Sequence, residues 1–168
     1  MIELVAVIVL VGILAAFAAP RFMQNEAFDA RTFTDQNLNM LRYAQKLAIA
    51  QGRPVFAVLS AERIALCFDA TCTAANRVLA PAGTNSRSNA TSAQCTGADT
   101  WFCEGRPAKV SFGVPTGGLS FYFNALGRPF MATDIDPVSS FVRQQISISS
   151  GGDTRTVLIE AETGYVHL

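Results

Sequence analysis

The sequence predicts an α+β protein in which a long N-terminal hydrophobic helix carries a β-rich head. Three observations predict this fold: an unbroken apolar run at the start, a helical pattern of apolar residues after it, and short apolar segments separated by turn residues in the remainder. We expect residues 1–20 to form a transmembrane or filament-core segment, residues 21–52 the amphipathic second half of the helix, and residues 53–168 the head. The 168 residues suffice for one globular domain.

The composition narrows the class of protein. Thirteen basic and thirteen acidic residues give a formal net charge of +0, which excludes a whole-molecule field that would gather nucleic acid or anionic lipid. Only 15% of the residues are charged and 50% are hydrophobic, so the head has enough apolar residues to bury a core of its own. A folded head on a hydrophobic rod is therefore expected.

The first segment is apolar over a length at the short end of the range for a bilayer span. Residues 2–19 contain one charged residue, Glu3, and a span needs about 17 to 25 residues. Arg21 would then lie at the far headgroup boundary. A plain membrane anchor and a signal peptide are alternatives, because residues 16–18 have the small-x-small form that signal peptidase accepts, although a signal peptide opens with cationic residues.

Glu3 needs an explanation because an ionised carboxylate is unfavourable beside the hydrocarbon core. One interpretation places Glu3 among lipid headgroups, where it complements the positive end of the helix dipole. The other supplies a cationic partner from a second subunit.

The second half of the helix carries an apolar stripe. Between residues 25 and 51 apolar side chains recur at spacings of three and four, and this stripe consists of Leu38, Leu41, Ala44, Leu47 and Ala48. Gly52 and Pro54 should end the helix. If both halves are continuous, the helix is about 75 Å long at 1.5 Å per residue. Pro20 then either kinks one helix or separates two.

The head should be an antiparallel sheet of hairpins packed against this stripe. Turn residues separate apolar segments at residues 55–59 and 64–68, at 109–113 and 119–123, and at 145–149 and 156–161, and a last strand covers 165–168. Residues 70–105 are rich in Thr, Ser, Asn and Ala and are predicted to form a long surface loop.

Four cysteines lie in or beside that loop: Cys67, Cys72, Cys95 and Cys103. An even number in an exported head suggests two disulfides with three connectivities, of which we favour the local pairing Cys67–Cys72 and Cys95–Cys103. A zinc site is the competing interpretation, but neither pair has the spacing of common zinc knuckles.

The sequence contains few candidate catalytic residues, and we expect neither an enzyme, nor a cofactor, nor a metal site. His167 is the sole histidine and lies next to the C-terminus. Asp134 and Asp136 could touch a calcium ion, although two carboxylates beside a proline more often mark a turn. Gly117-Gly118 and Gly151-Gly152 lie where hairpins should turn, not in a phosphate loop.

The run from Ile2 to Phe22, IELVAVIVLVGILAAFAAPRF, resembles the start of type IV pilins and type II secretion pseudopilins. In that family a prepilin peptidase removes a short basic leader ending in Gly, the new N-terminal Phe is methylated, and Thr-Leu precede Ile-Glu. Met1 stands where the family has Leu, and the leader and the first two mature residues have no counterpart in this sequence. The resemblance implies that Glu3 pairs with the terminal amine of a neighbouring subunit, and that Pro20 kinks one continuous helix.

The head is also similar in layout to minor pilins of the mannose-sensitive haemagglutinin type and to H-type minor pseudopilins, through residues 126–129 and the closing turn at 164–166. The resemblance implies a minor-pilin-like subunit that acts in pilus initiation, tip or assembly. A minor pseudopilin of a type II secretion system is the alternative. The implied partners are other pilin subunits, an inner-membrane assembly platform, prepilin peptidase and membrane lipid. The implied location is a single pass of the bacterial inner membrane with the head in the periplasm, followed by the pilus on the cell surface.

A third hypothesis is a minor pilin that captures DNA. Arg77, Arg87 and Arg106 could share one face of the long loop, and arginine suits phosphate because its guanidinium donates two parallel hydrogen bonds. The hypothesis is the weakest of the three, because the arginines are scattered and the C-terminal residues 165–168 carry no arginine cluster.

Overall fold

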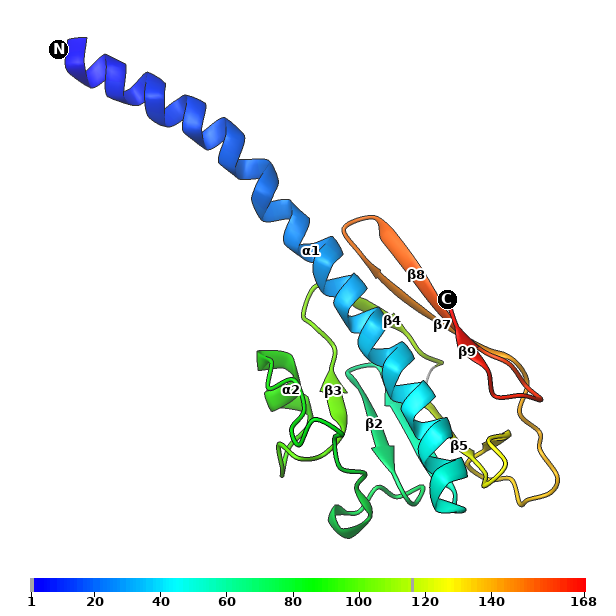
Figure 1. The fold of residues 1–168 in the computed structure, drawn as a ribbon. Helices are drawn as coiled ribbons and strands as arrows, with labels where there is room; N and C mark the ends of the chain where they lie inside the picture. Colours follow the sequence, from blue (N-terminus) through cyan, green and yellow to red (C-terminus); the bar gives the residue numbers. More distant parts are fainter. Residues whose placement is uncertain (1, 116) are drawn as a thin grey trace.

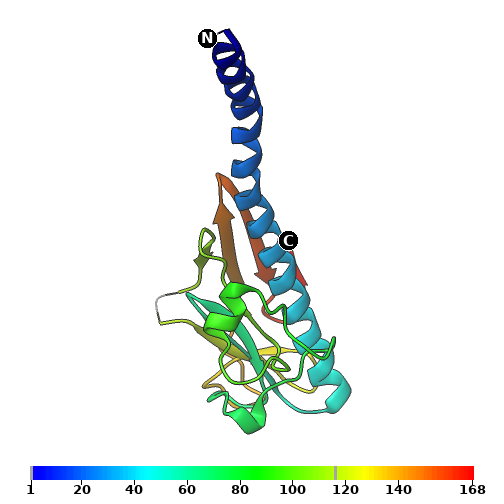
Figure 2. The same cartoon turned by 90° about the vertical axis from the view of Figure 1, so that its left-hand side faces the viewer.

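The computed structural model describes residues 2–115 and 117–168, without the side chains of residues 16–26. It has two parts, a long helix α1 (Ile2–Gln51) and a head built on the second half of that helix (Figure 1). The N-terminal half of α1 projects away from the head in both views (Figures 1 and 2). The fold is therefore α+β, as the sequence predicts.

Helix α1 runs through Pro20 without a break. The interpretation that Pro20 separates two helices is wrong, and both views show α1 curving between its halves. The helix ends where glycine permits a left-handed residue: Gly52 has φ 60°. There the backbone N–H of Arg53 donates to the carbonyl of Ala48 over 3.3 Å, so one of the last helical carbonyls has a partner.

The head contains two antiparallel sheets instead of the single sheet that we expect from the sequence. One has the strand order β3-β2-β1-β5-β6 and the other the order β4-β7-β8-β9. Helix α1 contacts strands of both sheets. The strands are β1 (Val55–Ser60), β2 (Arg63–Cys67), β3 (Cys103–Gly105), β4 (Ser111–Gly113), β5 (Leu119–Phe123), β6 (Pro129–Met131), β7 (Gln144–Ser150), β8 (Asp153–Ile159) and β9 (Val166–His167).

Two of the three predicted hairpins form and one does not. Strands β1 and β2 pair around Ser60–Arg63, and β7 and β8 pair around Ser150–Asp153. The segments 109–113 and 119–123 do not pair with each other: β4 pairs with β7, and β5 pairs with β1. The chain crosses from one sheet to the other after β4, and at the far end of this crossing Gly118 has φ 92°.

The core lies between α1 and the two sheets. Of the predicted stripe, Leu38, Leu41, Ala44 and Ala48 are buried, and Leu47 is partly buried against the core. The stripe also extends further toward the N-terminus than the five predicted residues, to Phe33 and Ala30, and it includes Met40 between Leu38 and Leu41. Two polar residues, Thr34 and Asn37, are buried within this stripe, and their side chains bond their own helix. Thr34 Oγ1 donates to the carbonyl of Ala30 over 2.7 Å, and Asn37 Nδ2 to that of Phe33 over 2.7 Å.

The predicted surface loop at 70–105 is more structured than its composition suggested. It holds a short 3₁₀ helix, η1 (Ala74–Asn76), a short helix α2 (Asn89–Gln94), and the whole of β3. Trp101, in the same stretch, is buried, and its indole N–H donates to the carbonyl of Leu66 over 3.1 Å. The disulfides have the local pairing, Cys67–Cys72 and Cys95–Cys103, so both ends of the stretch are tied to the sheet.

Candidate assembly interface

The N-terminal half of α1 is an apolar surface that no described residue of the head covers. Every described side chain from Ile2 to Ala15 is exposed. Its large apolar side chains are more than half exposed, and Ile2 reaches 88%. They lie on all sides of the helix and are Ile2, Leu4, Val5, Val7, Ile8, Val9, Leu10, Val11, Ile13 and Leu14. A helix that is hydrophobic all round belongs in an apolar environment.

The local sequence gives this half of α1 little reason to be helical in water. Seven residues between positions 2 and 13 are β-branched, which lowers intrinsic helix propensity. Tertiary packing normally supplies the missing stability, and here the head supplies none because it packs only on the second half of α1. An apolar surrounding that offers no competing hydrogen bonds, whether lipid or neighbouring helices, would stabilise the helix. We name residues 2–15 the bare half of α1.

Glu3 is the acidic residue in the first turn of α1, and it is exposed. At that position its carboxylate complements the positive end of the helix dipole. In an apolar surrounding, the same carboxylate would need a cationic partner. The geometry thus places the one charged residue of the bare half at its free end, as far as the helix allows from the head.

Pro20 belongs to residues 16–26, whose side chains lie outside the described residues. In the part of the chain that the structure describes, no helix reaches the length and apolarity of a membrane span. The membrane span that we expect over residues 2–19 includes residues 16–19, whose side chains also lie outside the described residues.

The head is fixed to the second half of α1 by polar side chains that reach backbone carbonyls far along the chain. Arg42 Nε donates to the carbonyl of Val166 over 2.9 Å. Gln45 Nε2 donates to the carbonyls of Gly127 over 2.9 Å and Thr163 over 2.8 Å. Sequence reasoning missed both residues, because an Arg and a Gln on a helix give no signal of their distant acceptors.

Gly164 makes this attachment sterically feasible. It has φ 64°, and a Cβ there would lie 2.4 Å from the carbonyl oxygen of Gly127 and 2.8 Å from Gln45 Nε2. A side chain at position 164 would therefore push apart the two turns that Gln45 joins. The turns at 126–129 and 164–166, which carry part of the sequence resemblance, are in contact in the structure.

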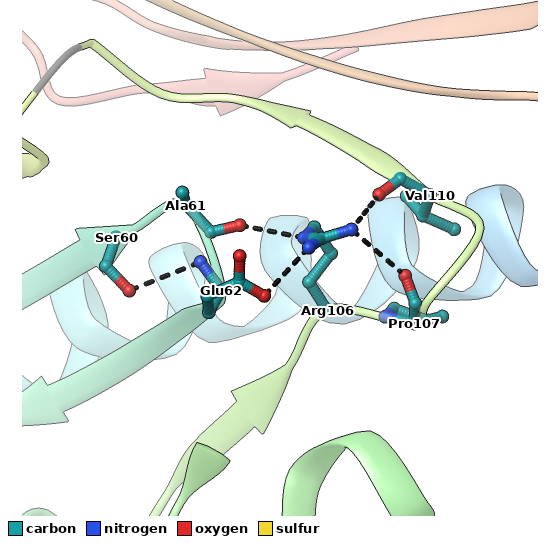
Figure 3. A network of polar contacts seen from close by, with 6 residues as sticks. All are labelled: Ser60, Ala61, Glu62, Arg106, Pro107 and Val110. Atoms are coloured by element: carbon teal, nitrogen blue, oxygen red, sulfur yellow. Dashed lines mark hydrogen bonds and ion pairs between the residues drawn. The ribbon is translucent and has the colours of Figure 1, made fainter. Parts of the chain in front are cut away.

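The structure does not gather the three arginines of the DNA hypothesis into one free cationic surface. Arg87 Nε is 3.2 Å from a carboxylate oxygen of Asp99, and Arg106 Nη2 is 2.7 Å from one of Glu62. Figure 3 shows that Arg106 also donates to the carbonyls of Ala61 and Val110, over 2.8 and 2.6 Å. Its guanidinium ties the β1–β2 turn to the segment before β4. Arg77 differs from both because it stacks on Trp101, with its Cζ 4.1 Å from the ring centroid.

The Asp134 carboxylate accepts hydrogen bonds from residues of its own loop. It accepts hydrogen bonds from the Ser140 hydroxyl over 2.7 Å and from the backbone N–H groups of Ser140 and Met131, each over 2.8 Å. The hydroxyl of Ser140 contributes most to lowering the pKa of Asp134, and the two N–H groups reinforce it against partial desolvation. Asp136 accepts from Asn124 Nδ2 over 2.9 Å instead of facing the same point. The arrangement is that of a turn.

Tyr122 and His167 each lie near a carboxylate. Burial raises the pKa of Tyr122, and the charge of Asp136 adds to the effect. His167 Nε2 lies 3.1 Å from a carboxylate oxygen of Glu160, just after β8, so the imidazole has a hydrogen-bonding partner within the head. Within the described residues no cluster of His, Cys, Asp and Glu side chains has the makings of a metal site.

The buried carboxylate of Glu104, which no motif in the sequence marks, holds α2 onto the sheet. Glu104 is 5% exposed and accepts hydrogen bonds from the Ser86 N–H over 2.8 Å, the Ser86 hydroxyl, and the Thr91 hydroxyl over 2.8 Å. Thr91 Oγ1 in turn accepts from the N–H of Gly105 over 3.0 Å. Fully bonded, this carboxylate acts as a structural tie between the loop and β3.

Fold and interface together define a rod-and-head α+β protein with one uncovered apolar helix half. No protein-family model matches the chain, and no curated protein matches its sequence. Two crystal structures of the type IV minor pilin FimU of Pseudomonas aeruginosa strain PAO1 are similar to it. The P65 form is 16% identical with a TM-score of 0.48, covering 82% of this chain and 90% of that chain. The P21 form is 16% identical with a TM-score of 0.47, covering 90% and 91%.

Proposed function

We propose that this chain is a minor-pilin-like structural subunit of a bacterial type IV pilus, whose bare half of α1 packs among the equivalent helices of other subunits. The observation that carries the proposal is the combination of an all-round apolar helix half with one carboxylate in its first turn, Glu3. The sequence resemblance of residues 2–22 supports it. Assembly by helix packing requires these features and no catalytic group.

In the proposed mechanism the bare half of α1 moves from lipid into a bundle of apolar helices. Before assembly the bare half lies in lipid, as a single pass of the bacterial inner membrane with the head in the periplasm. During assembly a platform in that membrane moves the subunit into a helical bundle, and Glu3 neutralises the terminal amine of a neighbour. Desolvation makes an unpaired charge unfavourable in that bundle, so the pairing also selects the register between neighbours. The finished filament carries the head to the cell surface, where it would act in initiation or at the tip.

Replacement of Glu3 tests the proposal. In the native cell, Glu3→Ala should abolish or strongly reduce piliation while the membrane level of the protein stays normal. Asp35→Ala is the matched control because Asp35 is an exposed carboxylate on the packed half of the same helix. Normal piliation in Glu3→Ala cells would contradict the role of Glu3, and loss of the protein itself would mean that Glu3 acts on stability.

A pseudopilus of a type II secretion system would use the same helix interface, and deletion of the whole chain separates the two machines. A subunit of a pilus should be needed for surface filaments, whereas a pseudopilin should be needed for export of secreted enzymes. We place the chain in the pilus, and a secretion defect with normal pili would reverse that choice. DNA capture is not proposed, because Arg87 and Arg106 are paired with carboxylates.

A further inference from the structure

A recess in the disulfide-bonded part of the head has one charged residue in its wall. Its volume is about 390 Å³, within the range of sites for small ligands. Small and apolar residues form most of the wall, which consists of Ala74, Ala75, Arg77, Leu79, Gly97, Ala98, Thr100 and Trp101. We call this the Arg77 recess.

Arg77 lacks the acceptor that a half-buried guanidinium normally has. In the described part of the chain its Nε is buried with no hydrogen-bond partner. Asp99, which lies between the wall residues Ala98 and Thr100, is paired with Arg87 instead. Leaving a buried donor unbonded is unfavourable, so an arginine kept in such a position calls for an explanation beyond stability.

The guanidinium is nevertheless held in place. It lies over the ring of Trp101, whose indole N–H is bonded to the carbonyl of Leu66. It also lies against Gly97, where a Cβ would be 2.5 Å from Arg77 Nη1. The guanidinium thus occupies the space that a side chain at position 97 would enter. Arg77 is therefore preorganised as a planar cation.

The walls of the recess are rigid for a surface loop. Residues 74–79 follow the Cys67–Cys72 disulfide, and residues 97–101 lie between Cys95 and Cys103. Backbone hydrogen bonds join the two walls: the N–H of Ala80 donates to the carbonyl of Thr100 over 2.8 Å, and the N–H of Phe102 to that of Val78 over 2.8 Å. Both disulfides thus stabilise the geometry of one recess.

The Trp101 ring has two cations beside it. A second guanidinium, that of Arg63, lies 5.3 Å from the centroid of the Trp101 ring, and it donates to the carbonyl of Gln94, which carries no full charge. Two cations near one buried ring, with no carboxylate in the recess wall, favour an anionic ligand. A planar guanidinium suits a carboxylate because two parallel N–H···O bonds form at once.

We propose that the Arg77 recess binds a carboxylate carried on a small, otherwise uncharged body, with Arg77 as the residue that recognises the anion. The small and apolar wall residues would contact the uncharged body of the ligand. This site is independent of the assembly interface, since it belongs to the head and does not involve α1.

Trp101 is the only tryptophan of the chain, so its fluorescence reports on the recess directly. The 168-residue chain, in nonionic detergent, is titrated with acetate, glucuronate and inorganic phosphate at constant ionic strength maintained with sodium chloride. The expected result is a saturable change with the carboxylates that is weakened about tenfold or more in Arg77→Gln, as expected when a charge-assisted pair is lost. Glucose serves as the uncharged counterpart of glucuronate.

Arg143→Gln is the matched control, because it removes the same charge from an exposed arginine of the head whose partner, Glu160, lies outside the recess wall, and it should leave the affinity unchanged. Intact mass without reduction and the thermal midpoint verify that each variant keeps both disulfides and its fold. If Arg77→Gln does not fold, Arg77→Lys replaces it and should bind the carboxylate several-fold more weakly, because lysine keeps the charge but not the planar pair of donors.

Absence of a saturable signal with either carboxylate would overturn the proposal, as would equal affinities of the wild type and the Arg77 variant. Saturation with phosphate alone would also overturn it, since the site would then recognise a different anion.

Discussion

Replacement of Gly164 by alanine should loosen the head from α1. The new Cβ would lie 2.4 Å from the Gly127 carbonyl oxygen, 2.8 Å from Gln45 Nε2 and 2.9 Å from Phe123 Cε1. The first of these contacts is with backbone, so the turns must separate. Separation breaks the two hydrogen bonds of Gln45, each of which contributes about 1 kcal/mol.

The left-handed backbone adds to this effect. Alanine at φ 64° is less favourable than glycine by roughly 1 kcal/mol. Together with the lost hydrogen bonds, the free energy of unfolding should fall by about 2–4 kcal/mol in Gly164→Ala.

Gly152→Ala separates the steric contribution from the backbone one. Gly152 has φ 86°, and no atom lies within 4 Å of the Cβ that would be added there. This control should therefore lose only about 1 kcal/mol. The assay is urea unfolding of the detergent-solubilised chain, followed by the fluorescence of Trp101. Equal losses in the two variants would refute the idea that the Gly127–Gly164 contact fixes the head on the helix.

Two further predictions concern the core and the pH dependence of stability. Leu41→Ala empties a fully buried position between α1 and the sheets and should lower the free energy of unfolding by about 2–5 kcal/mol, whereas Leu126→Ala, at an 85% exposed position, should change it by less than about 0.5 kcal/mol in the same urea assay. Because the pKa of Asp134 is lower in the folded than in the unfolded chain, its charge stabilises the fold above the unfolded value of about 4, and this stabilisation is lost as the pH falls through the folded pKa. Asp134→Asn should therefore reduce the thermal midpoint most at neutral pH and converge with the wild type in acid, and parallel curves from pH 7 to pH 2 would contradict the linkage.

The sequence predicts the parts of the fold that depend on residues close together along the chain. The end of α1 follows from Gly52 and Pro54, because a left-handed glycine and a nearby proline stop a helix wherever it lies. The β7–β8 hairpin follows from Gly151-Gly152, whose φ angles of 59° and 86° suit the tight turn that joins twisted strands. The buried stripe of α1 follows from the helical period.

Other features depend on partners that are distant in sequence. The turn residues after β4 predicted a hairpin, but turn chemistry does not reveal that β4 joins β7 in one sheet while β5 joins β1 in the other. Trp101 lies in a polar stretch and is buried because two disulfides and the Leu66 carbonyl hold it against β2. No pattern in the neighbouring residues indicates either the strand pairing or the burial of Trp101.

The candidate interface divides in the same way. Glu3 and the apolar run are visible in the sequence because composition alone marks them. The roles of Arg42 and Gln45, which bond the head to α1, and of Arg77, which stacks on Trp101, depend on what surrounds each side chain and are visible only in the structure.

Photo-crosslinking from the bare half of α1 tests the central claim most directly. A photoreactive amino acid replaces Val9 in the native cell, and Leu79, an exposed apolar residue of the head, serves as the comparison position. Position 9 should crosslink to other pilin-like subunits in assembled filaments and lose these adducts when the assembly motor is inactive. A subunit that functions normally while position 9 reacts with lipid alone, in filaments as in membranes, would contradict the claim.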